Sequence, residues 1–261
     1  MLLATMIRSI KKKIKTYLDN YLRDNLAKYH RQREDSLENW FYYWLWFQNM
    51  SYAKDYSPKN TYYEFGTGWG GTLSEFLKAV TRFGKDHKID IEEFRIFLFD
   101  SFEGLPPVTR REDDHPAWNK GEFAYSKEYI EEIVKTHHFP LENVTFIEGY
   151  FDRTLNAETL AGIKDYPPSI ITMDVDYYSS TIEALNFVAP ILKSGTVFYF
   201  DDLYSFFLHP DLGQVKAISE FNNSGIGYLN PLTYRNHEGR CHLFVRREWE
   251  HFREQPKDQT A

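Results

Sequence analysis

Short apolar runs alternate with amphipathic stretches from about residue 60 onwards. The apolar runs are rich in β-branched and aromatic residues, which favour strands; they are TYYEF (61–65), FRIFLF (94–99), NVTFIE (143–148), SIITMD (169–174) and TVFYFD (196–201). Stretches with helical spacing fall between them, at 70–83, 125–137, 156–163 and 179–193. Nearly continuous apolar strands joined by helices predict a parallel sheet that is covered on both faces.

The pattern changes near the C-terminus. The segments GIGYLNPLTYRN (225–236) and RCHLFVRRE (240–248) follow each other without an intervening helix. Two strands this close together pair through a short turn, here Asn236 to Gly239. We therefore expect an antiparallel pair at the end of an otherwise parallel sheet.

The first 58 residues lack this alternation. Apolar residues at three- and four-residue steps predict a basic amphipathic helix over 5–34: Ile7, Ile10, Ile14, Leu18, Leu22 and Leu26. Its basic face fits a helix packed on a partner subunit better than one resting on an anionic membrane surface.

A second helix is predicted from Asp35, because Asp35 and Glu38 have the spacing of a capping box. We expect the aromatic run that follows, WFYYWLWF (40–47), to be buried rather than to line a substrate cleft.

These patterns divide the chain into an N-terminal helical extension (1–58), which serves as an oligomer interface or a substrate lid, a main domain (59–250) and a polar tail (251–261). A homo-oligomer is expected. The net charge of −7 argues against nucleic acid as the partner. The single cysteine, Cys241, gives no sign of a disulfide framework, and neither a secretory signal nor a transmembrane segment is recognised, so a cytoplasmic location is expected.

A glycine-rich turn, FGTGWGG (65–71), follows the first predicted strand. Gly66, Gly68 and Gly71 match the dinucleotide pattern G-x-G-x-x-G, in which glycines let a ligand approach the backbone. Glu64 suits the ammonium of an amino-acid-like ligand better than a pyrophosphate. The acid that ends the next strand, Asp100, lies 29 residues beyond Gly71, whereas the dinucleotide pattern places it roughly 20 residues on. S-adenosylmethionine fits both residues, with its ammonium near Glu64 and its ribose near Asp100.

Carboxylates follow two neighbouring predicted strands: Asp174 and Asp176 the fourth, Asp201 and Asp202 the fifth. The carboxyl ends of parallel strands meet at one edge of the sheet, where ligands bind. Unpaired carboxylates repel one another, and a hard cation such as Mg²⁺ relieves that repulsion. Asp176 alone fits a turn or capping role. Ser180 and Glu183 have capping-box spacing for the next helix.

Three segments, LFDSFEGLPP (98–107), VTFIEGYFDRTL (144–155) and MDVDYYSSTIEALNFVAPILKSGTVFYFDD (173–202), resemble the macrocin O-methyltransferase (TylF) family. The likeness covers roughly residues 60–205. It implies a Rossmann-like class I methyltransferase fold, an α/β fold with a mostly parallel seven-stranded sheet and an antiparallel last hairpin. It also implies S-adenosylmethionine as methyl donor, a Mg²⁺ ion, and commonly a sugar hydroxyl as acceptor, on a small molecule or a glycan.

The resemblance places the family's metal ligands on Asp174, Asp201 and Asp202. With the glycine turn, it assigns the cofactor to Glu64, Gly66, Thr67, Gly68, Gly70, Asp100, Ser101, Gly149, Tyr150 and Phe151. The chain departs from the family where Val175, rather than glycine, stands between the two aspartates, and where its glycine turn carries Gly68 and Trp69.

Two residues are candidates for removing the acceptor's proton. Asp174 lies at the metal site, although a metal-bound carboxylate is a weak base. His115 is a stronger base and lies in VTRREDDHPAWNKGEF (108–123), a loop in the position of a lid. Trp118 and Tyr178 are candidates for stacking on a sugar.

Three alternatives remain open at this point. The first is a catechol-like acceptor, which also presents adjacent oxygens to a metal. The second is a metal-dependent glycosyltransferase that uses the D-x-D of Asp174 and Asp176. The third is a non-catalytic partner protein on the same scaffold.

Overall fold

A computed structural model of the chain describes residues 36–235 and 240–248. Within these residues, seven strands form one sheet: β1 (Thr61–Phe65), β2 (Arg95–Asp100), β3 (Val144–Glu148), β4 (Ile170–Met173), β5 (Val197–Phe200), β6 (Gly227–Arg235) and β7 (Arg240–Arg246). Their order is β3-β2-β1-β4-β5-β7-β6, and β7 runs antiparallel to both of its neighbours. The predicted parallel strands and the antiparallel pair are confirmed.

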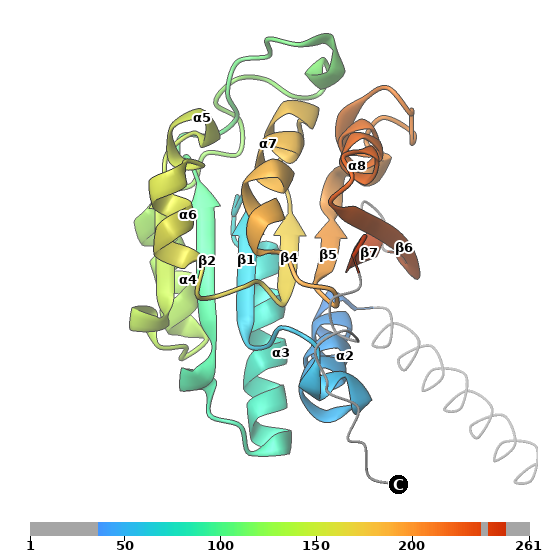
Figure 1. The fold of residues 1–261 in the computed structure, drawn as a ribbon. Helices are drawn as coiled ribbons and strands as arrows, with labels where there is room; N and C mark the ends of the chain where they lie inside the picture. The colour runs from blue at the N-terminus through green and yellow to red at the C-terminus, as the bar shows by residue number, and fades with distance from the viewer. Residues whose placement is uncertain (1–35, 236–239, 249–261) are drawn as a thin grey trace, which may run out of the picture.

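Helices cover both faces of the sheet, giving three layers (Figure 1). One face carries α2 (Leu37–Met50), α3 (Gly71–His87) and α4 (Lys127–Thr136); the other carries α5 (Phe151–Thr154), α6 (Ala157–Ile163), α7 (Tyr178–Val188) and α8 (Gly213–Asn223). Short 3₁₀ turns lie at Tyr52–Asp55, Ile91–Glu93, Arg111–Asp113, Leu141–Asn143, Ala189–Ile191 and Asp201–Tyr204. The four predicted helices after residue 60 correspond to α3, α4, α6 and α7.

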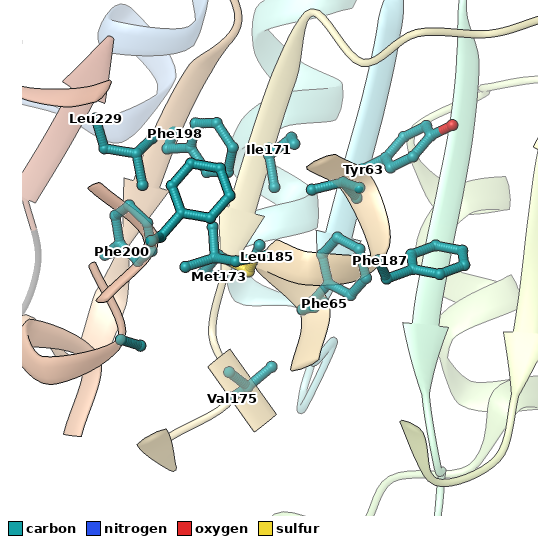
Figure 2. Packing of buried hydrophobic residues seen from close by; sticks show 14 of the residues in the cluster. Tyr63, Phe65, Ile171, Met173, Val175, Leu185, Phe187, Phe198, Phe200 and Leu229 are labelled. Atoms are coloured by element: carbon teal, nitrogen blue, oxygen red, sulfur yellow. The ribbon is translucent and has the colours of Figure 1, made fainter. Parts of the chain in front are cut away.

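Alternation along the strands builds a core on each face, because successive side chains in a strand point to opposite sides. In β1, Tyr62 packs on the side of α2 and α3, whereas Tyr63 and Phe65 pack on the side of α7. Figure 2 shows the second core, in which Phe65 and Met173 lie beside Leu185 of α7. Both cores are fully enclosed, so the strand ends are held on a rigid support.

Helix α2 is part of this packed structure, although the sequence analysis assigned its residues to the extension. Its buried side is formed by Trp40, Phe41, Trp44, Leu45 and Gln48. Gln48 donates from Nε2 to the backbone oxygens of Ser169 (2.9 Å) and Gly195 (3.1 Å), the residues just before β4 and β5. The aromatic run is therefore buried on one side only, since Tyr43 and Trp46 stay exposed.

The start of α2 and the helix after β5 differ from the predictions. Ser36 caps α2 by accepting from Asn39 N at 3.3 Å, one residue later than the predicted cap at Asp35. Helix α8 was not predicted, because it begins at a glycine without a side-chain cap and has few apolar positions. Residues 5–34, the Asn236–Gly239 turn and the tail 251–261 lie outside the described residues. No helix among the described residues is long and apolar enough to cross a membrane.

The glycine turn after β1 is pressed against the end of β4. Gly66 has φ +77°, and a Cβ added to it would lie 1.7 Å from the backbone oxygen of Asp174. Two backbone hydrogen bonds fix this contact: Gly66 N donates to Phe99 O and Asp174 N donates to Phe65 O, both at 2.9 Å. Only glycine fits this position.

We predict that Gly66→Ala destabilises the fold by about 3 kcal/mol or more, because overpacking adds to the cost of a positive φ. Gly68→Ala is the matched control: Gly68 also has a positive φ (+47°), but no atom lies within 4 Å of its added Cβ. Gly68→Ala is expected to lower the free energy of unfolding by only about 1–2 kcal/mol. Urea unfolding measures both values, and equal losses would contradict the close-contact argument.

Candidate active site

The parallel strands β2, β1, β4 and β5 end at one edge of the sheet (Figure 1). The strand order reverses between β1 and β4, so chain connections leave in opposite directions at this point. Such switch points form the ligand-binding crevices of open α/β sheets. The glycine turn follows β1, Asp100 ends β2, and the aspartates follow β4 and β5.

Asp100 holds the glycine turn in place. Its Oδ2 accepts from Thr67 N at 2.6 Å and from Gly68 N at 3.3 Å, and its Oδ1 accepts from Phe102 N at 2.7 Å. Burial raises the pKa of Asp100, and these amide donors lower it. The turn and Asp100 are thus one unit, and each carboxylate oxygen has further capacity to accept from a ligand hydroxyl.

Glu64 lies in β1, two residues before Gly66, and 0 % of its surface is exposed. Tyr62 Oη donates to Glu64 Oε2 at 2.8 Å, whereas Oε1 has no hydrogen-bond partner among the described residues. Burial raises the pKa of Glu64 to about 8, helped by the charges of Asp100 and Asp201. Contact between Glu64 and the ammonium of a ligand stays a prediction.

The remaining predicted cofactor residues lie around the same edge. Gly149 N donates to Asp100 O at 2.9 Å, which places the turn after β3 next to Asp100. Tyr150 precedes α5, and the ring of Phe151 lies 5.8 Å from Phe65, partly in the core. Ser101 Oγ donates to Gly104 O at 3.0 Å and stabilises its own turn. Gly70 precedes α3 with φ +77°.

Three carboxylates converge at the ends of β4 and β5. Asp174, Asp201 and Asp202 each offer one oxygen, and the three oxygens lie within 4.8 Å of one another. Burial raises the pKa of Asp174 well above its usual range, and the charges of Asp201 and Asp202 raise it further. This set matches the predicted metal ligands, and oxygen-only donors suit a hard divalent cation.

Neighbouring groups orient these carboxylates. Tyr199 Oη donates to Asp201 Oδ1 at 2.6 Å, and Asp176 N donates to Asp202 Oδ2 at 2.9 Å. Asp176 has φ +58°, and Tyr177 N donates to Val175 O across it at 2.5 Å, a tight γ-turn. The turn role expected of Asp176 is therefore present, and it positions Asp202. Asp176 does not belong to the converging set, so the two aspartates of the D-x-D pattern differ in their surroundings.

His115 lies in an aromatic cluster rather than against a carboxylate. Its ring centroid is 4.2 Å from that of Trp118 and 5.1 Å from that of Phe206. Ala117 N donates to His115 Nδ1 at 3.3 Å, a hydrogen bond within the loop itself. The role of His115 as the base stays a prediction.

Tyr178, the other stacking candidate, is buried. Its hydroxyl donates to Glu220 Oε2 at 2.7 Å, and Lys216 Nζ lies 4.7 Å from its ring centroid. It therefore has no face available for a sugar.

The raised pKa of Glu64 predicts how stability depends on pH. In the unfolded chain this carboxyl loses its proton near its ordinary pKa of 4.5, whereas in the folded chain it keeps the proton until about pH 8. Between these values the folded state binds more protons, so the free energy of unfolding falls as pH rises. Glu64→Gln, which keeps an oxygen for Tyr62, is expected to flatten this decline.

Urea unfolding between about pH 5 and about pH 9 without divalent cations measures this effect. The exposed Glu103→Gln serves as the control and should retain the slope of the unmodified chain. An unchanged slope in Glu64→Gln would mean that burial of Glu64 does not control this pH dependence.

Known proteins resemble this chain in sequence and in fold. The chain matches the model of the family described as macrocin-O-methyltransferase (TylF) over residues 63–225. A Streptomyces olivaceus protein, 8-demethyl-8-(2,3-dimethoxy-alpha-L-rhamnosyl)-tetracenomycin-C 4'-O-methyltransferase, is 29% identical over 141 residues, which are 51% of this chain and 49% of that protein. The chain thus aligns with about half the length of this relative.

Two solved structures share the fold. The calicheamicin methyltransferase CalS11 has a TM-score of 0.60 at 20% identity, covering 86% of this chain and 85% of that one. The O-methyltransferase NovP has a TM-score of 0.59 at 20% identity, covering 80% and 79%. These matches confirm the Rossmann-like methyltransferase fold expected from the sequence. The family model matches more than half of the length of this chain, and the chain therefore belongs to the macrocin-O-methyltransferase (TylF) family.

Proposed function

We propose that this protein is an O-methyltransferase that uses S-adenosylmethionine and Mg²⁺ to methylate a hydroxyl of a sugar. The observation that carries the proposal is the convergence of Asp174, Asp201 and Asp202 at the strand edge that also carries the glycine turn and Asp100. Family membership supports the reaction class. The name of the Streptomyces olivaceus relative, which specifies a rhamnosyl group, supports a sugar acceptor.

The residues present fit the methyl donor. Gly66 leaves no space for a Cβ, so its turn lies as close to β4 as a backbone can. Asp100 would accept from the ribose hydroxyls, with the Gly66–Gly70 turn and the Gly149–Phe151 segment on either side. Glu64 Oε1, which has no hydrogen-bond partner among the described residues, would favour a ligand that carries positive charge. S-adenosylmethionine, when bound, supplies a methyl group activated by the sulfonium.

The residues also fit the metal. Asp174, Asp201 and Asp202 would hold a divalent cation, and Tyr199 with the Asp176 turn would keep two of these carboxylates oriented. Mg²⁺, when bound, supplies positive charge that lowers the pKa of a neighbouring acceptor hydroxyl.

The chain's own task is then to position the acceptor and remove one proton. Asp174 and His115 are the candidates from the sequence. Asp176 is a third, because Asp201 and Asp202 both affect the pKa of its carboxyl, which lies beside the converging set without belonging to it. We therefore assign proton removal to one of these three residues.

The first test is calorimetric titration with S-adenosylhomocysteine, which should bind one site per chain. Asp100→Ala is expected to weaken this binding at least about tenfold, because the ribose acceptor and the support of the glycine turn are both lost. Glu103→Ala, an exposed change in the next loop, is the control. Absence of binding to the unmodified protein would refute the proposed donor.

The second test concerns the metal. Asp202→Ala is predicted to lower kcat by at least about 100-fold, while affinity for S-adenosylhomocysteine changes little. Radiolabelled methyl transfer to TDP-L-rhamnose and methyl α-L-rhamnopyranoside, with catechol as the competing acceptor, measures turnover. Asp211→Ala, an exposed aspartate after β5, is the matched control. Full activity after EDTA treatment would remove the metal from the mechanism, and transfer to catechol alone would exclude the sugar.

A further inference from the structure

The long connection between β2 and α4 is closed at its base by backbone hydrogen bonds. Leu105 N donates to Glu122 O at 3.0 Å, and Gly121 N donates to Leu105 O at 2.9 Å. Residues 106–120 between these bonds form a compact Ω-type loop, here called the acceptor loop. It arches over the edge of the sheet where β2, β1 and β4 end (Figure 1).

A buried aspartate fixes one side of the acceptor loop. Asp113 is 1 % exposed, and its Oδ1 accepts from Ser179 N, in the first turn of α7, at 3.0 Å. The N-cap residue of α7, Tyr177, contributes no side-chain cap, so Asp113 supplies one from a distant part of the chain. The capping box predicted at Ser180 and Glu183 was therefore wrong, since α7 already begins at Tyr178.

A salt bridge ties the same part of the loop to α8. Glu112 Oε1 lies 2.6 Å from Lys216 Nζ, and both side chains are about three-quarters buried, at 28 % and 23 % exposed. Lys216 also lies over the ring of Tyr178. The loop is thus held to both α7 and α8. These helices follow β4 and β5, the strands whose ends carry the three converging carboxylates.

The tip of the loop completes an aromatic cluster next to the carboxylates. The ring centroid of Trp118 lies 5.9 Å from that of Tyr177, the residue after Asp176, and 5.5 Å from that of Phe206, which follows the Asp201–Tyr204 turn. Trp118 and Phe206 remain partly exposed, whereas Tyr177 is buried beneath them. Partly exposed rings of this kind present an apolar surface to a ligand.

We propose that the acceptor loop is a preassembled wall of the acceptor pocket, in which Trp118 and Phe206 bind the sugar ring and Asp113 is the positioning residue. This proposal rests on the proposed function and adds to it the residues that select the acceptor. Its physical basis is that two polar anchors and a closed base hold the loop in place without any ligand. The loop therefore differs from the closing lid that the sequence suggested.

Asp113 is tested with three variants. Asp113→Ala loses the acceptor for Ser179 N, Asp113→Asn retains an oxygen in the same position, and Asp114→Ala changes the exposed neighbour. Limited trypsin digestion reports on loop anchoring, since Arg110, Arg111 and Lys120 are exposed cleavage sites in the loop. Asp113→Ala should be cut there at least about tenfold faster, while the other two variants should be cut at the rate of the unmodified protein.

The kinetic test separates positioning from general instability. Asp113→Ala should raise KM for the rhamnoside about tenfold or more, with kcat reduced less and the Kd for S-adenosylhomocysteine unchanged. Asp113→Asn should restore KM. Unchanged cleavage and unchanged KM in Asp113→Ala would overturn the proposal, as would equal losses of donor and acceptor affinity.

The stacking surface is tested by Trp118→Ala and Phe206→Ala, with Phe207→Ala as the matched control because the Phe207 side chain is 96 % exposed. The first two variants should raise KM for methyl α-L-rhamnopyranoside at least about fivefold, and the control should not. If the unmodified protein binds no S-adenosylhomocysteine or methylates no sugar, the proposed function fails, and this proposal fails with it. If it does both and KM stays constant in the variants, only the acceptor wall is refuted.

Discussion

Repulsion among carboxylates at one edge of the sheet is the constraint on which the rest of this structure depends. Asp174, Asp201 and Asp202 converge from two adjacent strands. Asp100 raises the pKa of nearby Glu64, and Glu64 in turn raises the pKa of Asp174. A fold tolerates such a group only if donors compensate it, because buried charge is costly when unpaired. Tyrosine hydroxyls and backbone amides supply that compensation in part. Under the proposed function, the converging aspartates are the groups that would hold a cation.

The two aromatic cores provide the stiffness that this arrangement requires. Carboxylates that repel one another move apart if the strands that carry them can move. Here those strands, β1, β4 and β5, are short and fully buried. Gln48 extends the same rigidity to α2 by joining the segments that precede β4 and β5. An apparently peripheral helix therefore helps to set the spacing of the carboxylates at the opposite ends of those strands.

Local patterns in the sequence were sufficient to predict the strands, the glycine turn and the three converging aspartates. These features depend on residues close together in the chain and on the rule that parallel strands end at one edge. Features that depend on distant contacts could not be predicted in this way. The burial of Glu64 depends on where α3 packs, and the aromatic surroundings of His115 depend on the path of an irregular loop. The cap of α7 comes from Asp113, 66 residues away from Ser179, so no spacing rule along the chain could have found it.

The way the acceptor loop is anchored has a consequence for how its sequence can vary. The hydrogen bonds at Leu105, the Asp113 cap and the Glu112–Lys216 salt bridge hold the loop, and residues 114–120 lie between these anchors along the chain. On the proposed function, substitutions in that stretch would alter the surface presented to the acceptor while the anchors stay in place. Anchors and ligand-facing residues would thus be separated along the sequence, much as antibody loops are separated from their framework. His115, a candidate base, is the exception, so an evolving chain could exchange one acceptor for another by replacing the other six residues while its chemistry stays intact.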